Sequence, residues 1–160
     1  MQLEDGRMVV VVRLLGPAGA TYARLRVDTG DDISLLSPAV LAATGAAPVA
    51  VARIVGVDGV PVQAPVYRID MDVGPGLGVI RQAEVVGYPL TDSHWDGLFG
   101  DNLLRRCVLV RNGPSSTWSL QVVEAEPSPP SAHRRLAAAL GAAAVLAGAA
   151  LALAALRAET

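Results

Sequence analysis

Three carboxylates gather in one short stretch, VDTGDDISLLS, which covers residues 27–37 and lies between apolar residues. Such a stretch suits a tight turn, an ion-binding loop, or a catalytic carboxylate at the end of a strand. Calcium loops need oxygen ligands in the order D-x-D-x-D-G with a distal Glu. Asp28, Asp31 and Asp32 do not have that spacing, so we expect no metal here. The turn and the catalytic carboxylate both stay open, because Asp-Thr-Gly is also good turn chemistry.

The segments around this stretch predict β-structure. Residues 8–15 are rich in β-branched residues, and residues 21–27 alternate between apolar and polar and lead directly into Asp28. A short helical turn is expected from Ser37, closed by Gly45. The further predicted strands are residues 49–57, 60–71, 77–87 and 117–123.

Two glycine-containing segments need a separate interpretation. GPGLG, residues 74–78, has part of the pattern of a phosphate-binding loop, but no helix pattern follows it. We therefore interpret it as a hairpin connection. LLRRCVLVR, residues 103–111, predicts a helical turn that leads into a strand. Residues 1–123 are thus predicted to form a small all-β, barrel-like domain.

Residues 27–37 resemble the first motif of the retroviral-type (retropepsin-like) aspartic proteases, through Asp28-Thr29-Gly30 and Ser34-Leu35-Leu36. The second motif of that family is similar to Leu98-Phe99-Gly100-Asp101-Asn102. Between the two, IVGVDG is similar to the glycine-rich tip of the family's flap hairpin; its residues are Ile54, Val55, Gly56, Val57, Asp58 and Gly59. The three motifs follow in the family's order over most of residues 8–123, which implies a retropepsin-like closed β-barrel with a flap hairpin.

The resemblance also implies an activity. The chain contains one Asp-Thr-Gly, so two-carboxylate catalysis would require a homodimer in which each subunit contributes Asp28. Thr29 would form hydrogen bonds across the dimer, and Gly30 would permit close backbone approach. Asp31, Asp32 and the flap residues would contact an extended peptide substrate. Leu98, Phe99, Gly100 and Asn102 would support the catalytic loop from beneath, and no cofactor or metal is implied.

Two positions depart from the family pattern. Asp31 stands where the family has a small residue, and a further carboxylate beside the catalytic pair is expected to favour protonation, moving activity towards acidic pH or weakening it. Asp32 and Asp101 stand where the retroviral enzymes have an ion pair, so like charges replace that pair. The second departure weakens the expected dimer, and the first bears on catalysis itself.

The C-terminal region predicts a membrane anchor. Residues 136–156 contain no charged or polar side chain and as a helix would span about 31 Å, the thickness of a bilayer core. A soluble alanine-rich helix is the alternative, but it should keep a polar face. Residues 124–135 are a proline-rich linker, and Arg134 and Arg135 precede the span. This order predicts a single-pass protein whose catalytic domain faces the cytoplasm.

The net charge of −2 with no basic patch makes nucleic acid an unexpected partner. The sequence therefore predicts a membrane-tethered, homodimeric aspartic endopeptidase that acts on peptide or protein substrates. The alternative is a retropepsin-fold module with little or no catalysis that dimerises or binds an extended peptide. A third reading, a membrane-bound scaffold, would make all three motifs coincidental.

Overall fold

Aliphatic residues alternate between buried and exposed positions along the strands of this protein. The computed structural model describes residues 1, 3–56, 59–90 and 94–123, all of which fall within the unit Met1–Ala125. The predicted linker and membrane span, residues 124–135 and 136–156, lie outside the described residues. In the part of the chain that is described, no helix is long and apolar enough to cross a membrane.

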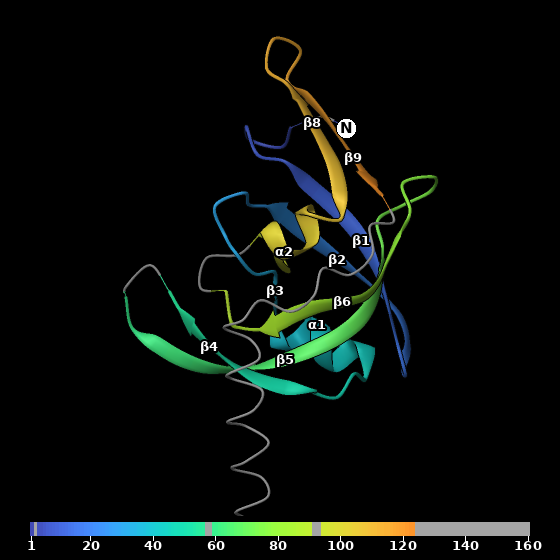
Figure 1. The fold of residues 1–160 in the computed structure, drawn as a ribbon. Coiled ribbons are helices and arrows are strands. Elements are labelled where there is room, and N and C mark those ends of the chain that lie inside the picture. The colour runs from blue at the N-terminus through green and yellow to red at the C-terminus, as the bar shows by residue number, and fades with distance from the viewer. Residues whose placement is uncertain (2, 57–58, 91–93, 124–160) are drawn as a thin grey trace, which may run out of the picture. The chain divides into compact units, whose positions relative to one another are not determined.

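Six strands close into a barrel, which confirms the predicted all-β fold (Figure 1). Neighbouring strands follow the order β1-β2-β7-β3-β6-β5, and β5 pairs again with β1. Going round the barrel, these strands are β1 (Val9–Gly16), β2 (Gly19–Val27), β7 (Gly97–Phe99), β3 (Leu35–Leu36), β6 (Val79–Gly87) and β5 (Pro61–Asp72). Closure satisfies the backbone groups that an open sheet would leave unpaired at its edges.

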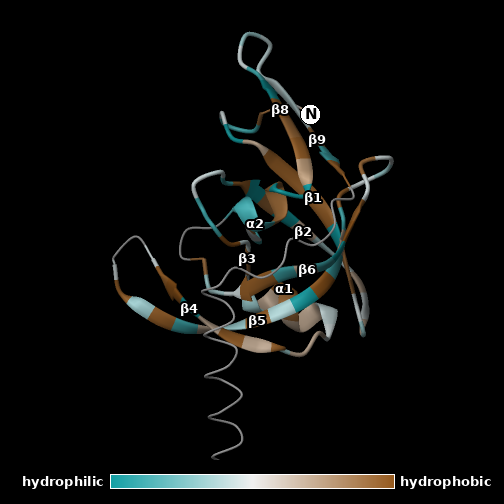
Figure 2. Ribbon diagram, viewed as in Figure 1, coloured by the Kyte–Doolittle hydropathy of each residue, from teal (hydrophilic) through white to brown (hydrophobic). Residues whose placement is uncertain are grey.

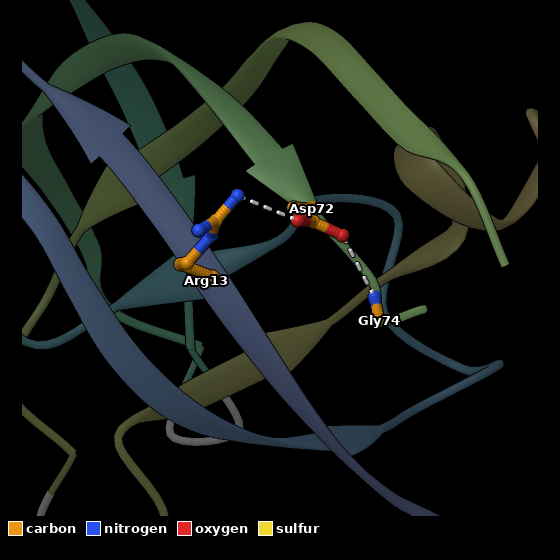
Figure 3. A network of polar contacts seen from close by, with 3 residues as sticks. All are labelled: Arg13, Asp72 and Gly74. Carbon is orange, nitrogen blue, oxygen red and sulfur yellow. Dashed lines mark hydrogen bonds and ion pairs between the residues drawn. The ribbon is translucent and has the colours of Figure 1, made fainter. Parts of the chain in front are cut away.

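The closing contact lies between the ends of β1 and β5, where Arg13 stands opposite Asp72. Arg13 Nη2 donates to Asp72 Oδ2 at 3.1 Å, and Asp72 Oδ1 accepts the Gly74 N–H at 3.0 Å. Figure 3 shows the three residues side by side with both contacts dashed. The Arg13 side chain is 45% exposed, so the ion pair contributes little stability. It aligns the two strands, and the second bond begins the turn towards β6.

The core consists of aliphatic side chains together with Phe99 and Trp118. β1 and β2 bury alternate residues, as period-2 alternation requires, and Figure 2 shows hydrophobic residues along β1 and β8. The largest side chains with at most 2% exposure are Phe99, Leu14, Leu25, Leu36, Leu41, Met71, Ile80, Leu103 and Leu120. Phe99 belongs to the second motif and is fully buried, so the motif is part of the core.

The helical turn predicted from Ser37 is confirmed as α1 (Pro38–Thr44). Ser37 caps it by accepting the Val40 N–H, and Gly45 ends it in the left-handed conformation at φ 67°. The helical turn expected within residues 103–111 begins earlier, as α2 (Asp101–Leu104), and β8 (Cys107–Asn112) follows it. β8 pairs with β9 (Thr117–Val122) as a separate two-stranded sheet.

β4 (Ala50–Val55) forms a long antiparallel hairpin with the first half of β5, from Ala50↔Val66 to Val55↔Pro61. The predicted strand 49–57 therefore ends early, because the turn begins at Gly56, whose carbonyl accepts the Gly59 N–H at 3.0 Å. The strand expected at 77–87 likewise begins only at Val79. Residues Gly74, Gly76 and Gly78 have φ values of 123°, 74° and 103° and form the turn.

Other pairings were not predicted. β3 and β7 contain only two and three residues, too few for a periodic pattern. At the N-terminus Glu4 and Arg7 form a β-bridge across a tight turn, and Met1 and Trp118 exchange backbone hydrogen bonds. The residue types of MQLEDGR do not indicate these pairings, because backbone groups rather than side chains form the hydrogen bonds.

Candidate active site

Strand β2 delivers Asp28 to the surface at the end of a fully paired segment. Val27, the last residue of β2, stands opposite Phe99 in β7. The Asp28 N–H donates to the Phe99 carbonyl at 3.0 Å. The chain then turns, and the Gly30 N–H donates to Asp28 Oδ1 at 3.1 Å. Asp28 is thus held both by its backbone and by one carboxylate oxygen, while Thr29 and Gly30 are exposed.

The second motif lies directly against this loop. β7 runs between β2 and β3, so that Leu98 stands opposite both Arg26 and Leu35. The structure therefore brings together two segments about seventy residues apart in the sequence. Parallel pairing of β7 with β2 places their carboxyl ends at the same edge of the sheet, and Asp28 and Gly100 follow those ends.

Ser34 and Asn102 join the two motifs through side-chain hydrogen bonds. Asn102 Oδ1 accepts both the Ser34 N–H and the Ser34 Oγ–H, each at 2.8 Å. Ser34 Oγ also accepts the Gly100 N–H at 2.8 Å, and Asn102 Nδ2 donates to the Glu84 carbonyl. Ser34 is only 1% exposed, and its polar atoms are satisfied there, as buried polar groups require. This network sets the position of the loop that carries Asp28.

Asp31 and Asp32 contribute to this junction through their backbones. Their carbonyl oxygens accept the N–H groups of Asp101 at 2.7 Å and Asn102 at 3.2 Å, which occupies the first donors of α2. The Asp32 side chain is exposed. Asp101 forms an ion pair with Arg105 at 2.5 Å, so its charge is compensated within α2 rather than between the motifs.

The surroundings of the Asp31 carboxyl change its pKa. Burial raises the pKa of Asp31 above its ordinary value of 3.8, and the nearby charge of Asp28 raises it further. The Arg26 guanidinium acts in the opposite sense and lowers it.

Replacing Asp31 by Asn is expected to stabilise the protein near neutral pH and to change little in acid. Because the pKa of Asp31 is raised on folding, the stability contributed by this residue is complete below its unfolded pKa and is lost as pH rises through the folded pKa. Asn avoids that loss. The side chain is partly solvated, so we expect a gain below about 0.5 kcal/mol.

Thermal unfolding of the wild-type protein and of Asp31→Asn at about pH 3 and about pH 7 measures this difference in stability. The curves should coincide in acid and separate near neutrality. A destabilised Asn variant at neutral pH would contradict the raised pKa, and the exposed Asp32→Asn serves as the control for removal of one negative charge.

Arg26 is a site residue that the motif comparison did not predict. Arg26 Nη2 forms an ion pair with Asp28 Oδ2, and the two side chains are 33% and 28% exposed. Residues two apart on a strand point to the same face. The spacing of Arg26 and Asp28 in the sequence therefore already indicated that their side chains could meet. The guanidinium partly neutralises the charge of Asp28, the carboxylate for which the family resemblance implies a catalytic role.

A cleft of about 310 Å³ lies beside this ion pair. Its walls come from the N-terminal turn, the end of β2 and the strand β8. The lining residues are Gly6, Arg7, Met8, Arg26, Val27, Asp28, Thr29 and Arg111. Arg7 and Arg111 are more than one hundred residues apart in the sequence, and no local pattern brings them together.

The predicted flap residues lie on the β4–β5 hairpin. Ile54 is partly buried and packs on a small cluster with Ala64, Val66 and Val86, to which Ile33 of the site loop also belongs. Val55 and Val60 are 62% and 55% exposed, while Gly59 has a φ of 73°. Val57 and Asp58 lie outside the described residues. The hairpin and the Asp28 loop therefore pack against the same small cluster, and the hairpin presents apolar side chains to solvent.

Among the described residues, no three His, Cys, Asp or Glu side chains are grouped to hold a metal ion. Burial raises the pKa of the Cys107 thiol to about 11, which keeps it protonated and a poor nucleophile near neutrality. The chain matches no protein-family model and no curated protein at a significant level. What the site can do follows from its own residues and geometry.

Proposed function

We propose that this protein is an aspartic endopeptidase of the retropepsin type, active as a homodimer. The observation that carries the proposal is the position of Asp28, which follows β2 in a turn that is hydrogen-bonded to the second motif. A carboxylate held in this way is ready for acid–base chemistry. The closed six-strand barrel supplies a rigid support on which catalytic geometry can be kept.

In the proposed mechanism, the Asp28 carboxyls of two subunits meet and share one proton, because two carboxylates in contact do not both ionise. The ionised carboxylate takes a proton from a water molecule, whose oxygen attacks the scissile carbonyl carbon. The protonated carboxyl donates its proton to the carbonyl oxygen. When the tetrahedral intermediate collapses and the C–N bond breaks, the carboxyl that took the proton from water passes it to the leaving nitrogen. A hydroxyl of the intermediate returns a proton to the other carboxylate, which restores the starting pair.

Two surface features support a homodimer. Thr29 and Gly30 are exposed beside Asp28, so a second copy could approach the loop closely. On β8, Val108 and Val110 are 50% and 54% exposed, and among the described strands β8 pairs with β9 alone. An apolar strand with an unpaired edge favours association with another chain.

The predicted membrane span would strengthen such a dimer by confining both copies to one surface, which raises their effective concentration. We propose that residues 136–156 tether the enzyme with residues 1–132 on the cytoplasmic side. Protease treatment of sealed vesicles that contain the full-length chain tests this topology. Digestion of the domain only from the cytoplasmic face supports it, and protection from that face contradicts it.

The ion pair between Arg26 and Asp28 favours a second candidate function, in which the fold binds an extended peptide without cleaving it. Arg26 occupies Asp28 Oδ2, whereas a catalytic pair must bring the two Asp28 carboxyls together so that they share a proton. Asp31 acts beside it as a further charged group. An enzyme would have to move Arg26 off Asp28 when two subunits and a substrate assemble.

Cleavage of a denatured protein mixture by the full-length chain distinguishes the two functions, measured from about pH 4 to pH 7, where a shared-proton pair works. The peptidase predicts new peptides that a statine-type inhibitor suppresses. Absence of cleavage over the whole range by both the wild-type chain and Asp31→Asn, even at high protein concentration, would exclude it and leave the binding module. If only Asp31→Asn cleaves, the peptidase is present but suppressed by Asp31.

A further inference from the structure

The cleft beside Asp28 carries an excess of positive charge. Three arginines line it, Arg7 from the N-terminal turn, Arg26 from β2 and Arg111 from β8, against the single carboxylate of Asp28. A concave surface lined with one sign of charge concentrates the electrostatic potential and attracts the opposite charge. The cleft is therefore built to attract an anion to the immediate neighbourhood of the proposed catalytic group.

Most arginines in the described residues are already neutralised. Six of them lie within ion-pair distance of a carboxylate: Arg13, Arg24, Arg26, Arg68, Arg81 and Arg105. Arg7 and Arg111 form no ion pair with any carboxylate of the described chain, although both line the same cleft. Their convergence on one concave site distinguishes them from the paired arginines.

The cleft already contains one bound carboxylate, that of Asp28. Arg26 binds the Asp28 carboxylate within it, and the planar guanidinium group matches the geometry of a carboxylate. The volume of about 310 Å³ has room for a carboxylate side chain.

We propose that the cleft binds a carboxylate of the peptide substrate, with Arg7 and Arg111 as its ligands. This inference rests on the proposed peptide-binding function and specifies its substrate class: peptides with an acidic residue, or with a free C-terminus, near the position that meets Asp28. Arg7 and Arg111 are then specificity-determining residues. They approach the ligand from two separate elements, which fixes its direction as well as its charge.

Peptide binding to the full-length chain tests the proposal without requiring cleavage. Three pools of short fluorescent peptides are compared by anisotropy. The first has a central Glu and a blocked C-terminus, and the second has Gln in place of that Glu. The third has the central Gln and a free C-terminal carboxylate. We expect the Glu pool or the free-carboxylate pool to bind about tenfold more tightly than the blocked Gln pool. Whichever pool binds more tightly identifies the source of the carboxylate. Equal binding of all three would overturn the proposal.

The decisive variant is Arg7→Gln/Arg111→Gln, in which the preference should fall to about twofold or less. Arg68→Gln/Arg81→Gln is the matched control, because it removes the same charge from side chains that are 56% and 76% exposed away from the cleft. The control should keep the full preference. The melting temperatures of the two double variants establish that both are folded. A preference for carboxylate peptides that persists in Arg7→Gln/Arg111→Gln would contradict the assignment of these two arginines as ligands.

Mapping of cleavage sites separates this inference from the proposed function. A peptidase with this cleft should show Asp and Glu enriched at one fixed position from the scissile bond, or cleavage at a fixed distance from the C-terminus. The single variant Arg111→Glu should reduce that enrichment and favour Arg and Lys. Cleavage without any acidic preference would overturn the inference alone. Carboxylate-selective binding without cleavage would instead overturn the peptidase and leave the inference standing.

Discussion

Asp28→Asn is expected to reduce peptide cleavage by about 10³-fold, within the range that acid–base groups contribute, while the protein remains folded. The amide keeps the shape of the side chain and the hydrogen bond from the Gly30 N–H, but it can neither take a proton from water nor share one with a second carboxyl. The ion pair with Arg26 is lost, yet both partners are partly exposed, so the melting temperature should change little.

Asp32→Asn is the matched control for Asp28→Asn. Asp32 lies in the same loop, its side chain is exposed, and the substitution removes the same charge. Cleavage rates and melting temperatures of the two variants are measured side by side. Asp32→Asn should keep most of the activity. Equal loss in both variants would show that loop charge, and not the Asp28 carboxyl, supports cleavage.

Mixing Asp28→Asn with the wild-type chain tests the shared site directly. If activity needs two Asp28 carboxyls and subunits exchange freely, equal amounts leave about a quarter of the dimers competent. Cleavage should then fall to about a quarter of the rate at the same total protein. A fall to about one half would indicate that each subunit acts independently, and would contradict the proposed pairing.

Gly100→Ala is expected to destabilise the protein by about 3 kcal/mol, the upper end of what overpacking costs in a filled core. The backbone of Gly100, with φ −89° and ψ −178°, is open to any residue, so the effect does not come from backbone strain. A Cβ atom there would lie 2.6 Å from the Ile33 carbonyl oxygen and 2.9 Å from that of Asp31. These are backbone atoms, and they move only if the Asp28 loop moves.

Gly113→Ala provides the comparison, since nothing lies within 4 Å of a Cβ at that position. Urea unfolding of both variants should show a clear loss for Gly100→Ala and a change within about 0.5 kcal/mol for Gly113→Ala. Cleavage by Gly100→Ala should also fall, by as much as about 10²-fold for a displacement near 1 Å. Wild-type stability in Gly100→Ala would contradict the tight packing of the two motifs.

Much of the local structure could be predicted from the sequence, because neighbouring residues determine it. Alternation in residues 21–27 places Asp28 at the end of a strand, and the same period puts Arg26 on the side of Asp28. Ser37 and Gly45 bound α1 by their own capping chemistry. The order of the motifs also led to the expectation that residues 98–102 support the loop.

Short strands and single backbone contacts were beyond such prediction. β3 has two residues, and its place between β6 and β7 depends on hydrogen bonds made to both neighbours. No residue type in MQLEDGR indicates that Met1 pairs with Trp118. Backbone groups are the same in every residue, so which of them meet is decided by the packing of the whole domain.

By itself the sequence therefore determined the longer strands, the capped helix α1 and the place of Asp28 at the end of β2, because each depends on residues close together in the chain. Only the tertiary structure decided that Arg13 meets Asp72 to close the barrel and that Asn102 holds Ser34. It alone brought Arg7 and Arg111 to one cleft beside Asp28. Such distant contacts form when the barrel closes around its buried side chains, since closure sets where each exposed side chain emerges.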